Sequence, residues 1–172
     1  MTKMQLIVFS GLPGTGKSML AEAVARQQGI PVFAKDWLEA VLLDAGLTPT
    51  ERLGYAGYDL LTTLARRQLS LGQSAILDSV ASFERIRAHW RELAYEFSAQ
   101  WRVVECVCSD EVAHRERLNG RQRHIPGWHE LTWADVERVH SYYEPWLDER
   151  LVVDGIRPFA DNLQVVLTYL QS

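Results

Sequence analysis

The amino-acid sequence predicts an α/β fold in which a parallel sheet of about five strands lies between helices. Five apolar runs of strand length recur along the chain, and segments with helical periodicity separate most of them. Continuous apolar runs are typical of strands that are buried on both faces. Because parallel strands need crossover connections, helices are expected on both faces of the sheet.

Each predicted strand is a short apolar run, and each predicted helix repeats apolar residues three or four positions apart. The strands are expected at residues 6–9, 31–34, 75–77, 103–107 and 151–153. The helices are expected at residues 17–27, 36–44, 51–71, 83–99, 110–120, 132–142 and 161–170. Glycines near the ends of four helices suit the left-handed cap conformation, namely Gly29, Gly46, Gly72 and Gly120.

Composition favours one domain, residues 1–172, with 47% hydrophobic residues for a single core. With 18 basic and 22 acidic residues, the charge balance gives no sign of a nucleic-acid surface, and no membrane partner is expected. Cys106 and Cys108 lie in an apolar run and are predicted to be buried free thiols. The first strand is too short for a signal segment, so a cytoplasmic location is expected.

The strongest functional signal is a phosphate-binding loop near the N-terminus. The pattern G-x-x-x-x-G-K-[ST] is matched by Gly11-Leu12-Pro13-Gly14-Thr15-Gly16-Lys17-Ser18, between an apolar strand and a helix-forming run. Its glycines let the backbone wrap tightly, so that several N–H groups and the positive end of the following helix face one anion. This P-loop predicts binding of the phosphates of a nucleoside triphosphate, and the alternative is a glycine-rich turn without a ligand.

Two side chains of the loop are expected to act directly on the nucleotide. Lys17 is predicted to reach the β- and γ-phosphates, and Ser18 to offer its hydroxyl to Mg²⁺. The predicted nucleotide-binding set is Gly11, Pro13, Gly14, Thr15, Gly16, Lys17, Ser18, Met19, Arg117 and Arg121.

Two acidic residues follow predicted strands. Asp78 ends the third strand beside the expected P-loop, where a carboxylate can hold Mg²⁺ directly or through water. Asp36 follows the second strand, where it can bind a substrate hydroxyl and accept its proton during phosphoryl transfer. Asp78 could instead cap a turn, and Asp36 could simply favour the helix dipole.

Three arginines gather near the polar segment 119–130, which is predicted to be a mobile lid. Arg117 and Arg121 share one helical face at positions i and i+4, and Arg123 lies just beyond them. Planar guanidinium groups there could lie over the base or neutralise the transferring phosphoryl group. The alternative is a solvated helix end with favourable cations.

The remaining candidates are weaker. The histidines show no metal-ligand spacing, so the only metal ligands expected are Ser18 and Asp78 toward Mg²⁺. Aromatic residues could form a wall of the acceptor pocket, although such residues are more often core; they are Trp37, Tyr55, Tyr58, Trp128 and Trp133.

With these features in this order, the chain resembles the small P-loop kinases of the nucleoside-monophosphate-kinase-like group. It is most similar to the "predicted kinase" or AAA-33 type family, whose relatives include chloramphenicol phosphotransferase, gluconate kinase and polynucleotide kinase. The resemblance implies a three-layer P-loop NTPase sandwich with sheet order 2-3-1-4-5, ATP with Mg²⁺, and a closing lid. It also implies that Lys17, Asp36, Arg117 and Arg121 take part in catalysis, and that Asp36 and Asp78 face the substrate.

The chain departs from many family members in one position. Many members of the family that the chain resembles have the pattern Asp-x-x-Arg after the second strand, whereas this chain has Asp36-Trp37-Leu38-Glu39. An arginine there would hold a phosphate on the acceptor, so a glutamate favours an uncharged hydroxyl compound.

The leading hypothesis is therefore ATP-dependent phosphorylation of a hydroxyl group on a small molecule. One alternative is a kinase of the 5′-hydroxyl of a polynucleotide, which would need a basic channel. A second is a non-enzymatic, nucleotide-dependent switch; the chain lacks the Asn-Lys-x-Asp sequence of guanine-specific switches. The motifs name neither the acceptor nor an oligomeric state.

Overall fold

The structure is a computed structural model that describes residues 3–48 and 51–172. Its strands are β1 Gln5–Ser10, β2 Val32–Ala34, β3 Ala75–Asp78, β4 Gln100–Val107 and β5 Leu151–Asp154. Its helices are α1 Lys17–Gln28, α2 Lys35–Asp44, α3 Glu51–Ser70, α4 Glu84–Glu96, α5 Glu111–Gly120, α6 Trp133–Tyr142 and α7 Phe159–Gln171.

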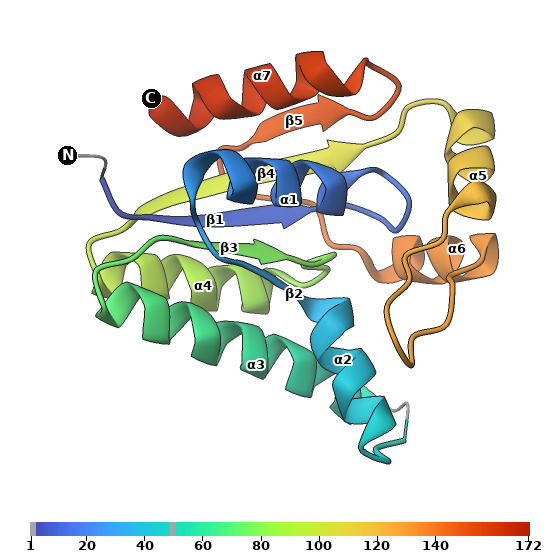
Figure 1. Ribbon diagram of the computed structural model, residues 1–172, viewed down its shortest axis with the longest axis horizontal. Coiled ribbons are helices and arrows are strands. Elements are labelled where there is room, and N and C mark those ends of the chain that lie inside the picture. Colours follow the sequence, from blue (N-terminus) through green and yellow to red (C-terminus); the bar gives the residue numbers. More distant parts are fainter. Residues whose placement is uncertain (1–2, 49–50) are drawn as a thin grey trace.

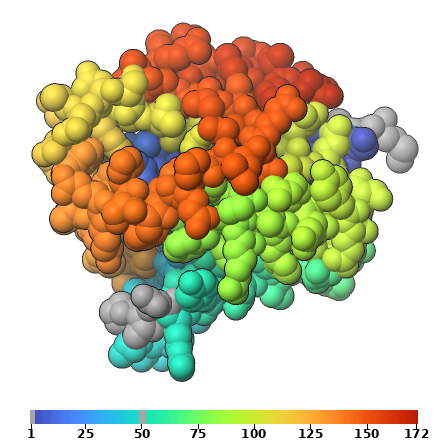
Figure 2. Space-filling view, turned by 180° about the vertical axis from the view of Figure 1, so that it is seen from behind, coloured from blue at the N-terminus to red at the C-terminus, as the bar shows by residue number. Residues whose placement is uncertain are grey.

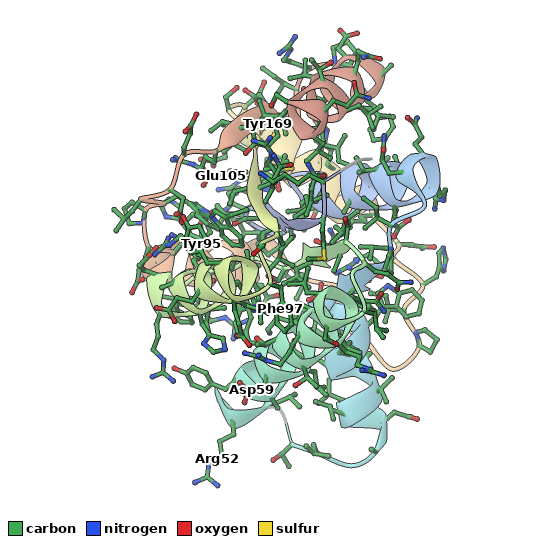
Figure 3. All side chains as sticks on the ribbon, turned by 90° about the vertical axis from the view of Figure 1, so that its left-hand side faces the viewer. Arg52, Asp59, Tyr95, Phe97, Glu105 and Tyr169 are labelled. Carbon is green, nitrogen blue, oxygen red and sulfur yellow. The ribbon has the colours of Figure 1, made fainter. Side chains whose placement is uncertain are left out.

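The five strands form one parallel sheet in the order β2-β3-β1-β4-β5, which confirms the expected fold class (Figure 1). Helices cover both faces. One buried cluster joins the sheet to α1 and α7, and the other joins it to α3 and α4. Seen from the amino-terminal ends of the strands, Tyr169 of α7 lies on one side of the sheet and Asp59 of α3 on the other (Figure 3).

The alternation of side chains along the strands divides the core between these two faces. In β1, Leu6 and Val8 pack toward α3 and α4, whereas Ile7 and Phe9 pack toward α1 and α7. All four side chains are fully buried, as expected for the central strand of a sheet that is covered on both faces.

The remaining helices lie at the carboxyl ends of the strands. There α5, α6 and the connection between them form a projecting layer beside the P-loop (Figure 1). The helix α5 ends at Gly120, as predicted, so the first two residues of the expected lid are helical and its non-helical part begins at Arg121. Ile125, within this connection, is buried.

A buried arginine fixes the segment between α6 and β5 against the end of β1. The guanidinium of Arg87 donates to the carbonyl oxygens of Ala81, Glu144 and Pro145 at 2.7–2.9 Å. Trp146 then donates from Nε1 to Oγ of Ser10, the residue before the P-loop, at 3.1 Å. These contacts hold the strand end from which the phosphate loop starts.

Both cysteines are free thiols, as predicted, but only Cys106 is buried. Cys108 follows the end of β4 and is half-buried, because the strand stops at Val107. Among the described residues, none of the helices combines the length and the apolar character that crossing a bilayer requires.

Candidate active site

The P-loop lies between β1 and α1, and its glycines occupy positions that a side chain would disturb. Gly11 has φ +139°, and a Cβ atom there would lie 2.1 Å from the carbonyl oxygen of Cys106. Gly14 has φ +86°, and a Cβ atom there would lie 3.1 Å from Nε2 of His114. The loop can therefore wrap tightly only with glycine at these positions, as its sequence pattern predicts.

Hydrogen bonds brace the same loop from inside and outside. Thr15 donates from Oγ1 to the carbonyl oxygen of Leu12 at 2.9 Å. His114 of α5 donates from Nε2 to the carbonyl oxygen of Pro13 at 2.7 Å, because a carbonyl can only accept. His114 was not predicted as a site residue. It lies four residues before Leu118 and so on the same helical face, a pattern that is too common to indicate a site.

Lys17 is buried at the start of α1 between two carboxylates. Burial lowers the pKa of its ammonium group, and the charges of Asp78 and Asp36 oppose that shift. The structure thus brings together the P-loop lysine and both acids that the sequence singled out, although the acids lie 42 residues apart at the ends of different strands.

Asp78, at the end of β3, is buried next to Lys17. Its Oδ1 atom is buried without a hydrogen-bond partner in the part of the chain that the structure describes. Burial raises the pKa of Asp78, while Lys17 and a hydrogen bond from the Ser18 side chain oppose the rise. A carboxylate oxygen without a partner beside a serine hydroxyl is a donor set that suits Mg²⁺, so these residues fit the ion expected with ATP.

A cleft of about 670 Å³ opens over the P-loop. It is lined by P-loop residues 14–18 with Met19, by the α5 end with Arg117, Arg121 and Arg123, by Trp37, and by Gly155, Arg157, Phe159 and Asn162. Figure 2 shows atoms of the N-terminal part of the chain, in blue, in a hollow between the yellow and orange segments. Elements far apart in sequence thus surround one site.

The three predicted arginines occupy different places in this cleft. Arg121 is half-buried, and its Nε and Nη2 atoms are buried without partners among the described residues. Arg123 forms an ion pair with Asp36, and Arg117 is exposed beside Gly155. Buried guanidinium donors without an acceptor are a group that suits an anionic ligand.

The ion pair with Arg123 dominates the state of Asp36. Burial alone would raise the pKa of this carboxyl group, but Arg123 and then Lys17 outweigh it and hold the pKa below its usual range. Asp36 is therefore ionised and paired with Arg123, a contact that was not predicted from the sequence.

The turn after β5 closes the far side of the cleft. Gly155 donates to the carbonyl oxygen of Val107 at 2.7 Å. A Cβ atom at Gly155 would lie 2.7 Å from Nη1 of Arg117 and 2.9 Å from the carbonyl oxygen of Thr15. The turn between β5 and α7 therefore lies close to both the P-loop and α5.

The five aromatic residues that were considered as a pocket wall lie in different environments. Trp37 is half exposed and lines the cleft, whereas Tyr58 is buried in the core against Trp90. Trp133 packs edge-on against His114, with ring centroids 5.1 Å apart. Of the other two, Tyr55 is exposed on α3 and Trp128 stacks on its neighbour His129.

Glu39, the position that departs from Asp-x-x-Arg, is buried and paired. It forms an ion pair with Lys35, and its side chain packs over Gly57 of α3, where a Cβ atom would lie 2.8 Å from Oε1. Lys35 also lies 4.6 Å from the ring centroid of Tyr58. The glutamate therefore neutralises the neighbouring lysine.

Parallel strands in this order, with a P-loop after the central strand, are the plan of the P-loop kinases, and the protein is a nucleotide-binding protein of that class. Within the class, residues 6–146 match the model of the AAA_33 family, which is described as an AAA domain, and the chain belongs to this family. The family expected from the sequence is thus confirmed. No curated protein matches the chain significantly.

Solved structures share the fold over almost the whole chain. A protein from Chloroflexus aurantiacus that is provisionally described as a kinase is 26% identical, with 98% of this chain and 100% of that chain covered and a TM-score of 0.76. A gluconokinase from Sinorhizobium meliloti is 22% identical, with 99% and 93% covered and a TM-score of 0.72. The APS kinase of Mycobacterium tuberculosis, in complex with AMPPNP and APS, is 22% identical, with 100% of each chain covered and a TM-score of 0.69.

Proposed function

We propose that this protein transfers the γ-phosphate of ATP to a hydroxyl group of a small molecule. The observation that carries the proposal is the position of Asp36. Its carboxylate pairs with Arg123 of the lid and is coupled electrostatically to Lys17 of the P-loop, and both of these cations line the cleft over the P-loop. A carboxylate that faces the phosphate site from the end of β2 is placed to receive an acceptor hydroxyl.

The P-loop and its neighbours would hold the nucleotide. Backbone amides of residues 14–18 and the Lys17 ammonium would bind the β- and γ-phosphates, and Arg117 would lie on the nucleotide side of the cleft. Ser18 and Asp78 would hold Mg²⁺, which neutralises phosphate charge when bound. Arg121, with its unpartnered donors, would stabilise charge that spreads over the transferring group.

The proposed transfer needs only these residues, ATP and the acceptor. The acceptor oxygen forms a bond to the γ-phosphorus as the bond to the β–γ bridging oxygen breaks, and ADP leaves with that electron pair. The proton of the acceptor hydroxyl passes to Asp36. The lid at about 119–130 would exclude water, which would otherwise hydrolyse ATP at an open site.

The acceptor side of the cluster favours a molecule without its own phosphate. Lys35, the cation next to Asp36, is already neutralised by the buried carboxylate of Glu39. A charged acceptor would need an unpaired cation there, as an arginine at the Glu39 position would supply. Gluconokinase and sugar kinase structures among the fold neighbours are consistent with a polyhydroxylated acceptor.

The test is ADP production from Mg-ATP with panels of sugars and sugar acids, nucleosides, aminoglycosides, phenicols and 5′-hydroxyl oligonucleotides. Stimulation by one small-molecule class supports the proposal and names the acceptor. Stimulation by oligonucleotides alone would replace it with polynucleotide kinase activity. ATP turnover that no acceptor increases would leave a nucleotide-dependent switch as the better reading.

Two variants and a matched control separate binding from transfer. Lys17→Ala should abolish nucleotide binding, and Asp36→Asn should reduce transfer about 100-fold or more while ATP still binds. Arg66→Gln removes an arginine whose ion pair with Glu96 lies on exposed surfaces of α3 and α4, and it should behave as wild type. An unchanged transfer rate in Asp36→Asn would end its catalytic assignment.

A further inference from the structure

The ion pair between Asp36 and Arg123 joins the expected acceptor group to the lid. Nη1 of Arg123 donates to Oδ2 of Asp36, and the two residues are 87 positions apart in the chain. Only 11% of the Arg123 side chain and 25% of the Asp36 side chain are exposed. A charged pair this well shielded from water is not a loose surface contact.

The backbone around Arg123 is anchored separately from its side chain. The N–H group of Arg123 donates to Oε1 of Glu130 at 2.8 Å, which closes the lid connection on itself. Ile125 is buried beneath the same connection. The guanidinium can therefore pass from one partner to another without unfolding the connection, whereas losing every partner would loosen it.

The phosphate site offers Arg123 a competing partner. Lys17, which would hold the γ-phosphate, is coupled electrostatically to both Asp36 and Arg123. The cluster holds three cations, Lys17, Arg121 and Arg123, beside the carboxylates of Asp36 and Asp78, and Glu130 also acts on Arg121. A γ-phosphate group brings several anionic oxygens, to which guanidinium binds with two parallel hydrogen bonds.

We propose that Arg123 blocks Asp36 until ATP binds, and that the γ-phosphate then draws the guanidinium away and frees the carboxylate for the acceptor hydroxyl. Arg123 is thus a catalytic residue with two successive partners, and ATP must bind before the acceptor. This inference rests on the proposed function, because it assigns Asp36 to the acceptor. It differs from the role of Arg121, whose donors are already free.

The first experiment needs no acceptor and follows hydrogen exchange of backbone amides in residues 119–130. Without nucleotide, Arg123→Gln and Asp36→Asn should each raise exchange of this segment about fivefold, and the double variant should add nothing further. With AMPPNP and Mg²⁺, wild type and Asp36→Asn should become protected, because Arg123 then has the phosphate as its partner. Arg123→Gln should stay exchangeable.

Controls keep the exchange experiment decisive. Arg138→Gln removes an exposed arginine that pairs with Asp135 on α6, and it should exchange as wild type does. Arg123→Lys keeps the charge but not the two parallel donors, so it should give intermediate protection even if Arg123→Gln folds poorly. Wild-type exchange in ligand-free Asp36→Asn, or full protection of Arg123→Gln by AMPPNP, would overturn the proposal.

The second experiment uses the acceptor that the panel identifies. Calorimetry should detect acceptor binding to wild type only in the presence of AMPPNP and Mg²⁺, whereas Arg123→Gln should bind it without nucleotide. Equal acceptor affinity with and without nucleotide in wild type would refute the blocking role. If no acceptor stimulates wild type, the proposed function fails while the exchange result on the ion pair still stands.

Discussion

His114 of α5 holds the P-loop through a 2.7 Å hydrogen bond from its Nε2 atom to the carbonyl oxygen of Pro13. Leu118, one helical turn later, packs against Gly14 of the same loop. Arg117 lies on this helix, and Arg121 follows its last residue. Since α5 rests on the loop through His114 and Leu118, this contact sets the distance between the arginines at the end of α5 and the P-loop.

Replacing His114 should therefore weaken ATP binding more than it slows transfer. His114→Leu removes the only donor to Pro13 described here and should raise KM for ATP about tenfold, with a stability loss of about 1–2 kcal/mol. His114→Gln keeps an N–H donor and should recover most of the affinity. Steady-state kinetics and urea unfolding measure the two effects. Equal KM values in the leucine and glutamine variants would show that His114 only fills space.

Gly155 gives a test of the turn that closes the cleft. Gly155→Ala would place Cβ 2.9 Å from the backbone oxygen of Thr15 and 2.7 Å from Nη1 of Arg117, so the turn must move away from the P-loop. Nucleotide affinity should fall about tenfold, measured by calorimetry with AMPPNP. Gly54→Ala on α3 is the matched control, because its Cβ meets nothing within 4 Å. Identical affinities in the two variants would contradict the close approach.

The sequence predicted the strands and helices because their signals are local. The apolar run at residues 103–107 indicated β4, but the strand begins earlier, at Gln100. Gln100, Trp101 and Arg102 lengthen it because they pair with Gln5, Leu6 and Ile7 of β1, and no pattern within β4 itself encodes that partner. The predicted helix at 83–99 ended too late, because Ser98 takes a positive φ of 55°.

In the candidate site too, residues with a local sequence signal were predicted and long-range contacts were not. Lys17, Asp36 and Asp78 could be found because each stands directly at a motif or strand end, and parallel strands bring such ends to one edge. The contacts of Arg123 with Asp36 and of His114 with Pro13 join residues 87 and 101 positions apart. They depend on the path of the lid across the sheet, which composition and periodicity do not specify.

The buried pair of Lys35 and Glu39 should be strongly coupled. Glu39→Gln would leave the Lys35 ammonium without its counter-charge and should lower the free energy of unfolding by about 3 kcal/mol. Adding Lys35→Met should restore most of this loss, since the uncompensated charge is then gone. Urea unfolding of wild type, the two single variants and the double variant gives the coupling energy directly. Additive effects of the two substitutions would mean that the pair does not interact in solution.

The buried carboxylate of Asp78, which is expected to hold Mg²⁺, should lower the stability of the ligand-free protein. Burial raises its pKa above the ordinary 3.8, although Lys17 and Ser18 oppose the rise. A carboxyl group with a raised pKa stabilises the fold while it is protonated, and this contribution is lost as pH rises through the folded-state pKa. As the pH rises above the ordinary pKa of a carboxyl group, Asp78 therefore lowers the stability of the ligand-free fold, because the folded chain disfavours its ionised form more than the unfolded chain does.

Asp78→Asn should consequently make the ligand-free protein more stable than wild type at pH 7, and this advantage should shrink as the pH is lowered toward 4. The same variant should lose most of the rise in Tm that Mg-ATP gives wild type, because the negative carboxylate expected to hold Mg²⁺ becomes a neutral amide. Thermal unfolding across this pH range, with and without Mg-ATP, measures both effects, and Asp59→Asn on the exposed face of α3 is the control. A stability difference that does not change with pH would mean that Asp78 titrates alike in the folded and unfolded chains, so that its burial beside Lys17 imposes no cost.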